Sequence, residues 1–171
     1  MTLWSFCSTV KKITSTFIQN IKQVDTIETL LIRPARQDDA AALCIINKYA
    51  LGYDFAPEKT AVRLAAVLAS QANRVFVAEL DGKAVGLLHG ADYDCIYAPS
   101  LKNILALAVL PDYQGKGVGR ALIAAVEAWA RECGAEGVRL VSGFNRTGAH
   151  AFYAACGYAL RKDQKNFFKL F

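Results

Sequence analysis

The most informative stretch of the chain is NILALAVLPDYQGKGVGR, residues 103–120. Its first part, 103–110, is an apolar run of strand length that a proline ends. Its second part places Gly115, Gly117 and Gly119 just before an apolar pattern with helical spacing. Glycine lets backbone N–H groups approach a ligand closely, and the first turn of a helix has unpaired donors and partial positive charge. The stretch therefore predicts a buried strand, a tight turn and a helix start that can bind an anion such as phosphate.

Two better-known phosphate motifs do not fit this turn. A P-loop needs a Gly-Lys-Ser/Thr step, which the turn lacks. A dinucleotide fingerprint G-x-G-x-x-G starting at Gly115 would need its third glycine where Arg120 is found. A turn whose glycines serve only tight packing is the alternative that these residues leave open.

The flanking sequence alternates between strand and helix patterns, which predicts a single mixed α/β domain. Asp81-Gly82 is a two-residue hairpin signal, and Asp38 or Asp39 is suited to cap the first helix. Leu122, Val126, Trp129 and Cys133 are expected to form the buried face of the long helix. The expected elements are a strand at 30–32, helices at 40–50 and 57–70, strands at 74–80 and 83–91, a polar loop with Asp92, Tyr93, Asp94 and Tyr97, a strand at 103–110, a helix at 118–133, a strand at 138–142, a helix at 147–156, and one or two strands from Tyr158 onward.

Composition limits the classes of function. The chain has 171 residues, of which 54% are hydrophobic and 20% charged, so it can bury a core as one domain. Three lysines that precede the first acidic residue contribute more than half of the net charge of +5. The rest of the chain therefore has only a weak positive charge, which argues against nucleic acid as a partner. No apolar run approaches the length of about 18 residues that a membrane-spanning helix needs. The five cysteines form no C-x-x-C pair, which argues against a structural metal site and favours a reducing, cytoplasmic compartment.

Residues 1–27 differ from the rest of the chain. They contain many Ser and Thr residues, and their apolar residues recur every three or four positions from Leu3 to Val24. This spacing predicts an amphipathic or flexible N-terminal extension, with docking to a partner or to an anionic membrane surface as the less favoured reading. The folded domain is expected over 28–171.

A second set of residues extends the pattern of the glycine turn. Gln114-x-x-Gly117-x-Gly119 after Leu107-Ala108-Val109-x-Pro111 resembles the acetyl-CoA signature of the GNAT N-acetyltransferase family. Downstream, Val138–Ser142 precedes Asn145, and AHAFYAACGY at 149–158 follows at the spacing that is usual in that family. The resemblance covers the chain from about Leu31 to its C-terminus. It implies the GNAT fold, a mostly antiparallel mixed sheet whose two central parallel strands are splayed apart, flanked by helices.

The resemblance also implies roles for particular residues. Acetyl-CoA would be the co-substrate, with no metal, and the amide of Leu107 would polarise the thioester carbonyl. Tyr153 would be the general acid that protonates the departing thiolate. The residues implied to bind the cofactor are Leu107, Ala108, Val109, Gln114, Gly115, Lys116, Gly117, Val118, Gly119, Arg120, Asn145 and Tyr153.

The general base is the part of the pattern that departs from the family. Many members have a carboxylate just ahead of the Leu-Ala-Val step, where this chain has Leu105 and Ala106. An amine with a pKa near 10 must lose a proton before it can attack. Candidates to accept that proton are Asp92, Asp94, His89, Glu79 and water.

The implied function is transfer of acetyl from acetyl-CoA to a primary amine, by direct attack in a ternary complex. A compact domain favours a small-molecule amine, and a homodimer is one option for the assembly. The alternatives are acetylation of a protein amine and a CoA-binding sensor without catalysis. The acceptor is expected in an aromatic, mildly acidic cleft formed by Tyr53, Asp54, Phe55, Tyr93, Asp94 and Tyr97.

Overall fold

The computed structural model describes residues 29–171, so the predicted extension at 1–27 lies outside the described residues. A five-stranded sheet forms the centre of the fold, with the strands in chain order β1-β2-β3-β4-β5. Neighbouring strands are antiparallel except for β4 and β5, which are parallel. The strands are β1 (Leu30–Pro34), β2 (Asn73–Leu80), β3 (Lys83–Cys95), β4 (Ala98–Val109) and β5 (Val138–Leu140).

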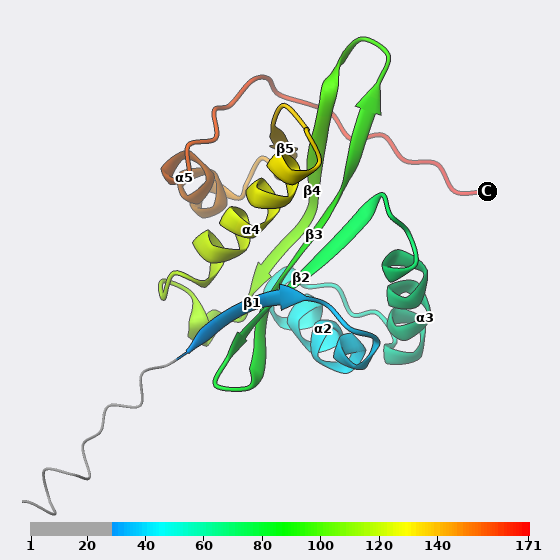
Figure 1. Ribbon diagram of the computed structural model, residues 1–171, viewed down its shortest axis with the longest axis vertical. Coiled ribbons are helices and arrows are strands. Elements are labelled where there is room, and N and C mark those ends of the chain that lie inside the picture. The colour runs from blue at the N-terminus through cyan, green and yellow to red at the C-terminus, as the bar shows by residue number, and fades with distance from the viewer. Residues whose placement is uncertain (1–28) are drawn as a thin grey trace, which may run out of the picture.

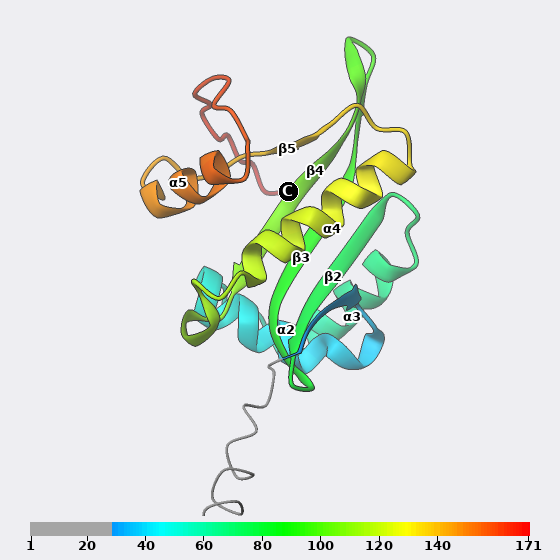
Figure 2. The ribbon, with the colours of Figure 1, turned by 60° about the vertical axis from the view of Figure 1, so that its left-hand side comes forward.

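Helices cover both faces of this sheet, as Figures 1 and 2 show. One face, here the α4 face, is covered by α4, and α5 packs beside it. The other face, here the α2/α3 face, is covered by the two earlier helices. The helices are α2 (Ala40–Ile46), which continues into a π-helical turn η2 (Asn47–Leu51), then α3 (Pro57–Leu68), α4 (Val118–Glu132) and α5 (Thr147–Ala155), with 3-10 turns η1 (Gln37–Asp39) and η3 (Pro111–Tyr113).

Each face has its own apolar core. On the α4 face, Leu122, Val126 and Trp129 of α4 are buried against Phe76 and Leu88 of the sheet. On the α2/α3 face, the buried set is Leu43, Ile46, Leu64, Val75, Val77 and Leu87. The predicted apolar stripe of the long helix is thus confirmed except at Cys133, which is exposed because α4 ends one residue earlier.

Two glycines of β3 allow α4 to lie close to the sheet. A Cβ at Gly90 would be 2.9 Å from Cζ3 of Trp129, and one at Gly86 would be 3.0 Å from the carbonyl oxygen of Ala108. Real Cβ atoms essentially never approach as closely as at Gly90, so glycine is a packing requirement there, and a Cβ at Gly86 would force the neighbouring atoms to shift by a few tenths of an ångström.

The hairpin turn between β2 and β3 is where the sequence predicted it. Asp81 has φ 49° and Gly82 has φ 78°, the two positive values that a type I′ turn needs.

The start of the first helix differs from the prediction that an aspartate side chain caps it. Asp39 makes no capping bond to α2 and instead forms an ion pair of 2.8 Å with Arg33 of β1.

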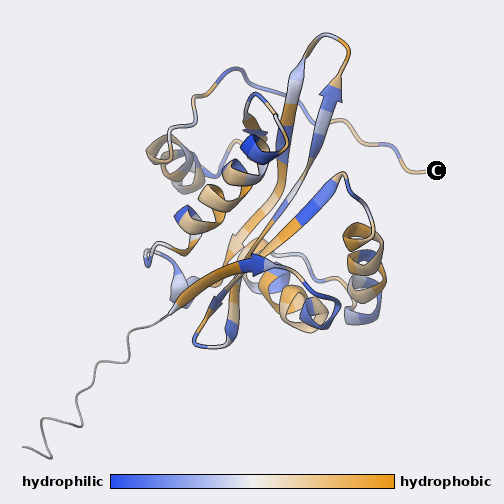
Figure 3. Cartoon of the chain, in the orientation of Figure 1, coloured by the Kyte–Doolittle hydropathy of each residue, from blue (hydrophilic) through white to orange (hydrophobic). Residues whose placement is uncertain are grey.

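The hairpin of β3 and β4 is longer than expected. Asp92, Tyr93 and Asp94, which were predicted to lie in a loop, belong to β3, and only Ile96 and Tyr97 connect the strands. Cross-strand contacts hold this arm, including the ion pair between Asp92 and Lys102. Figure 3 shows that β3 and β4 become more polar where they extend past the helices, which explains why the sequence pattern there resembled a loop.

A β-bulge in β4 sets the shape of the central gap. His89 of β3 pairs with Ala106, but Gly90 pairs with Ile104, so Leu105 is an extra residue on β4. A bulge bends its strand and increases the local twist. The parallel ladder with β5 ends one residue before it, at Ile104 and Leu140. The predicted splay of the two parallel strands is therefore confirmed.

The final strands predicted from Tyr158 onward are absent. No residue from 158 to 171 belongs to a strand, and every residue from 159 on is exposed. β5 is only three residues long, so it offers a short edge for pairing. Among residues 29–171, no helix is both long and apolar enough to cross a membrane.

Candidate functional site

The glycine turn joins β4 to α4 and has the conformation that the sequence predicted. Gly115 has φ 75° and Gly117, the N-cap residue of α4, has φ 84°. A Cβ added at either position would meet nothing within 4 Å. These two glycines are therefore required by backbone conformation, and the space in front of them is open.

The backbone amides of this turn are free to bind a ligand. Within the described chain, the N–H groups of residues 115–120 donate to no protein acceptor, and the first amide that does so is Ala121, which binds the carbonyl of Gly117 at 3.0 Å. The turn itself is exposed apart from Val118 and Gly119. The first turn of α4 has no acidic residue. Free N–H groups at a helix start, without a nearby carboxylate on that turn, form a site suited to an anion.

The third glycine of the motif, Gly119, is explained by packing and not by backbone conformation. Gly119 lies inside α4, and a Cβ there would be 3.2 Å from Cζ of Phe152. Because glycine has no Cβ, α5 can pack against the first turn of α4. Arg120 supports the same contact, because its Nη1 donates to the carbonyl of Ala155 at the end of α5, at 3.2 Å. Lys116 lies over the ring of Tyr113, 5.3 Å from its centroid, and adds a cation beside the turn.

Beyond the bulge, β4 presents backbone groups to the gap left by β5. The amide of Leu110 donates to Val85 of β3 at 2.9 Å. Since backbone groups alternate in direction along a strand, those of Leu107 and Val109 point away from β3, into the gap. The side chain of Gln114 donates to the carbonyl of Val109 at 3.0 Å, so that acceptor is already bound. The N–H and C=O groups of Leu107 and the N–H of Val109 therefore face the gap, beyond the end of the ladder with β5.

An unpaired polar atom follows β5. Ser142 comes two residues after the last ladder pair, and among the described residues its buried hydroxyl has no hydrogen-bond partner. A buried hydroxyl without a partner is costly. The gap and the glycine turn together fit a ligand with an anionic end and an extended arm that contains amides.

The helix α5 holds Tyr153 at the edge of the α4-face core. Its ring packs edge-on against Phe152, with centroids 5.4 Å apart, and against Tyr158 at 6.0 Å. Burial raises the pKa of the Tyr153 hydroxyl above its usual value of 10, while the charge of Arg146 acts in the opposite direction. Tyr153 therefore keeps its proton at neutral pH and can donate it.

The loop before α5 contains the other residue predicted to contact the cofactor. Asn145 is exposed in this loop. His150 holds the loop in place, because its Nε2 donates to the carbonyl of Gly143 at 3.0 Å. This contact gives His150 a structural role in the region between β5 and α5.

His89 lies directly across the ladder from Ala106, next to the bulge. Its Nε2 is 3.0 Å from Oδ1 of Asn73. The amide nitrogen of Asn73 donates to Ser70 at 3.0 Å, which directs its oxygen toward the imidazole. Nε2 must then carry the proton, and Nδ1 keeps a basic lone pair. Burial lowers the pKa of His89 from its usual 6.5, so the ring is neutral at pH 7.

The carboxylates considered as bases have other partners. Asp92 is paired with Lys102, whose ammonium group lies 4.2 Å from the ring centroid of Trp129, on the α4 face. Glu79 accepts from Nε of Arg33 at 2.8 Å. Among residues 29–171, no group of three or more His, Cys, Asp or Glu side chains is placed to hold a metal ion.

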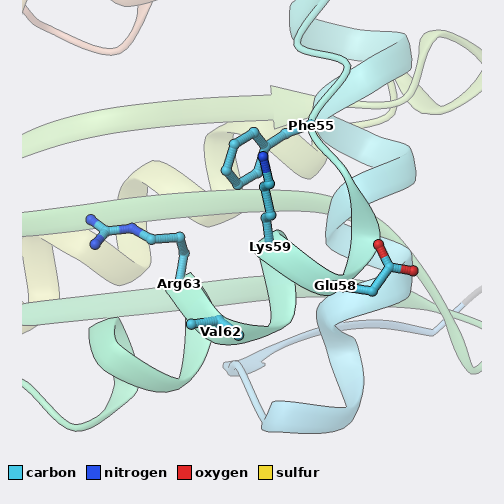
Figure 4. Close-up of a pocket in the computed structure, with 5 residues that line it drawn as sticks. All are labelled: Phe55, Glu58, Lys59, Val62 and Arg63. Atoms are coloured by element: carbon cyan, nitrogen blue, oxygen red, sulfur yellow. The ribbon is translucent and has the colours of Figure 1, made fainter. Parts of the chain in front are cut away.

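The aromatic residues expected around the acceptor do not form one acidic cleft. Asp54 is paired with Lys48 at 3.1 Å, and Asp94 alternates with Tyr93, which places it on the α4 face like Asp92. Phe55 does line an open depression of about 360 Å³ along α3. Figure 4 shows its ring next to Lys59, with Arg63 extending from the same side of the helix; the depression is lined by Phe55, Glu58, Lys59, Val62 and Arg63.

Sequence reasoning missed one polar group beside the gap. Arg139 of β5 donates from Nη1 to Oδ1 of Asn103 at 2.7 Å, and its guanidinium lies over the ring of Tyr93 at 4.2 Å. The only available signal was an arginine between Val138 and Leu140, which does not reveal its cross-strand partners.

Parts of the chain are similar in sequence to known N-acetyltransferases. The chain is 48% identical over 50 residues to aminoglycoside N(6′)-acetyltransferase type 1 of Stenotrophomonas maltophilia, a stretch of 29% of this chain and 33% of that protein. It is 36% identical over 80 residues to aminoalkylphosphonate N-acetyltransferase of Salmonella typhimurium, or 46% of this chain and 51% of that protein. The matched stretches thus span a third to a half of these relatives.

Solved structures and a family profile extend the match. The fold superposes on aminoglycoside N-acetyltransferase AAC(6′)-Iy in complex with CoA with a TM-score of 0.77, at 19% identity, covering 85% of this chain and 98% of that one. A putative acetyltransferase from Agrobacterium tumefaciens gives a TM-score of 0.74 at 23% identity, covering 81% and 99%. The sequence profile of the Acetyltransferase (GNAT) family matches residues 43–158. Because that match covers more than half of the chain, the protein belongs to the GNAT family of acetyltransferases.

Proposed function

We propose that this protein is an N-acetyltransferase that uses acetyl-CoA to acetylate a primary amine of a small molecule, by direct attack in a ternary complex. The observation that carries the proposal is the row of free amides at residues 115–120 beside an open gap between β4 and β5. Relatives named for an aminoglycoside and for an aminoalkylphosphonate support a small-molecule amine as the acceptor. Acetyl-CoA supplies the acyl group in an activated form, as a thioester.

The chain binds the cofactor at two places. The amides of residues 115–120 and the side chain of Lys116 hold the diphosphate, and Asn145 contacts the arm from the loop before α5. Leu107 pairs with the amides of the arm as a neighbouring strand would. Its N–H also donates to the thioester carbonyl as negative charge develops there, which lowers the barrier to attack. Gln114 acts indirectly by fixing Val109 and the turn.

Tyr153 is the general acid. Its hydroxyl is protonated at neutral pH, since the usual pKa of a tyrosine is already near 10 and burial raises that of Tyr153 further. It donates toward the departing sulphur, and a thiol with a pKa near 8.5 needs only modest help to leave. A positioned general acid typically contributes a factor of about 10² to 10⁴ to the rate.

We assign the general base to His89 in preference to Asp92. His89 is neutral at pH 7 and keeps a lone pair on Nδ1, since Asn73 accepts from Nε2. It lies on the α2/α3 face opposite Ala106, one of the two positions, with Leu105, where the family pattern would place a carboxylate. Asp92 is on the other face and is neutralised by Lys102.

The test measures release of CoA thiol with a panel of small amines. Thiol release above the hydrolysis background, slowed about 10²-fold or more in Tyr153→Phe, is the expected result. Acetyl-CoA affinity of the variant, measured by calorimetry, should stay within a few fold of the wild type. Tight acetyl-CoA binding with no acceleration by any amine would refute the proposal and favour a CoA-binding sensor. Acceleration only by a peptide amine would overturn the small-molecule acceptor.

A further inference from the structure

Arg139 is a half-buried cation that has no carboxylate partner in the described part of the chain. Its two contacts are with neutral groups, the side-chain oxygen of Asn103 at 2.7 Å and the ring of Tyr93 at 4.2 Å. These contacts fix the guanidinium in place without neutralising its charge. A guanidinium has five N–H donors, and Asn103 uses one of them.

The other cations that the sheet partly buries are neutralised. Arg33 is paired with Asp39 and Glu79, and Lys102 is paired with Asp92. Removing a charge from water is costly unless a partner compensates for it. Arg139 is the exception to this pattern, and a rigid guanidinium with free donors has the shape that binds a carboxylate or a phosphonate through two hydrogen bonds.

The position of Arg139 matches that of an acceptor. It pairs with Asn103 in the ladder, one residue before the last pair and the bulge. Val138 and Leu140 pack on the α4 core, so Arg139 points to the α2/α3 face. Asn103 is six residues from Val109, the last residue of β4, or about 20 Å along an extended strand, and the glycine turn comes after that. Arg139 is therefore too far away to hold the diphosphate that we place at that turn.

The acidic residues expected around the acceptor do not gather next to Arg139. Asp54 is paired with Lys48 at 3.1 Å in an exposed ion pair, and Asp94 lies in β3 on the α4 face. An acceptor with an anionic group fits the unpaired charge of Arg139 better than one that brings a further positive charge to it.

We propose that Arg139 is a specificity-determining residue that binds an anionic group of the acceptor, so that the preferred substrate has a carboxylate or phosphonate a few bonds from its primary amine. This inference rests on the proposed acetyltransferase activity for the role of the amine. It does not rest on that activity for the binding of the anion.

The first experiment compares acceptors that differ only in the anionic group. Thiol release is measured with propylamine, β-alanine and 3-aminopropylphosphonate, for the wild type and for Arg139→Gln. The wild type is expected to favour the anionic amines by about tenfold to a hundredfold in kcat/KM, the usual effect of a charge-assisted pair. Arg139→Gln should lose this preference while its rate with propylamine changes little. Preference for one anionic amine over the other identifies whether the anion is a carboxylate or a phosphonate.

Two further variants separate the local charge from other effects. Asn103→Asp places a carboxylate next to Nη1 of Arg139, so the substrate anion has to compete with it, and the preference should disappear although Arg139 is still present. Arg131→Gln removes an exposed cation from α4 that is paired with Glu127 at 3.5 Å, and should leave the preference intact. Equal loss of preference in Arg131→Gln and Arg139→Gln would overturn the proposal.

A binding measurement distinguishes failure of the inference from failure of the proposed function. The CoA-bound protein is titrated with 3-aminopropylphosphonate by calorimetry, which requires no turnover. Binding that Arg139→Gln weakens tenfold or more supports the anion site, even if no amine is acetylated. Acetylation of propylamine as fast as that of the anionic amines, or binding that Arg139→Gln leaves unchanged, refutes the anion site and leaves the acetyltransferase proposal intact.

Discussion

Replacing Gly117 by alanine tests the anion site at the start of α4. Gly117 has φ 84°, and a Cβ there would meet no atom within 4 Å. The added methyl group therefore causes no clash, and its cost to folding is that of a left-handed conformation, about 1–2 kcal/mol. For a domain of this size that lowers Tm by roughly 2–8 °C. The methyl group also occupies the open space in front of the amides, where the diphosphate would bind.

The expected loss of acetyl-CoA affinity is larger than this folding cost explains. Losing one hydrogen bond to a charged group costs about 1.5–3 kcal/mol, which is tenfold or more in Kd. Gly52 provides a matched control, because it has φ 79° and open space around its Cβ position, and it ends η2 and contributes no amide to the glycine turn. Gly52→Ala should lower Tm similarly and leave the Kd for acetyl-CoA, measured by calorimetry, unchanged. If Gly117→Ala binds acetyl-CoA as tightly as Gly52→Ala does, the amides of the turn do not hold the cofactor.

Three other predictions concern the base and the core. Burial lowers the pKa of His89 below 6.5, so kcat/KM should fall only as the pH drops below that value, and a pH–rate profile of His89→Gln should lack this acidic limb. Asp92→Asn should leave the nearly buried ammonium of Lys102 unpaired, which should lower the free energy of unfolding in urea by about 1–3 kcal/mol, a range that allows for the partial exposure of Asp92. The variant should keep its kcat, and loss of kcat in a folded variant would make Asp92 the base. Gly90→Ala places a Cβ 2.9 Å from Trp129 and should cost about 1–3 kcal/mol in the same urea assay, and a stability equal to that of the wild type would contradict the close packing of α4.

The elements that the sequence predicted correctly are those with local causes. The turn at Asp81-Gly82 needs two positive φ values, and the residues that tolerate them mark it. Gly134 and Gly157 end their helices with φ 69° and 90° for the same reason. The apolar period of α4 and the glycine turn before it are equally local, so the conformation of that turn was predictable, and its role in binding the cofactor stays a prediction.

The features that the sequence did not predict depend on partners far along the chain. Asp92 and Tyr93 resemble loop residues until β4 and β5 supply Lys102 and Arg139 as their partners. No local signal marks an unpaired strand position, so the bulge at Leu105 could be seen only in the register of β3 and β4. The strands predicted from Tyr158 onward are absent because they too depend on a distant partner. A strand forms only where a neighbouring strand offers a long enough edge, and β5 has only three residues.

The bulge at Leu105 connects these observations. One extra residue in β4 ends the parallel ladder at Ile104 and opens the gap in which Leu107 presents its backbone. The same insertion sets His89 opposite Ala106. Directly opposed residues on neighbouring antiparallel strands have Cβ atoms about 4.5–5.5 Å apart, so a side chain on β3 can reach the space that a carboxylate at Ala106 would occupy. This chain has no carboxylate at Leu105 or Ala106, and we propose that His89 of the adjacent strand supplies the titratable group there.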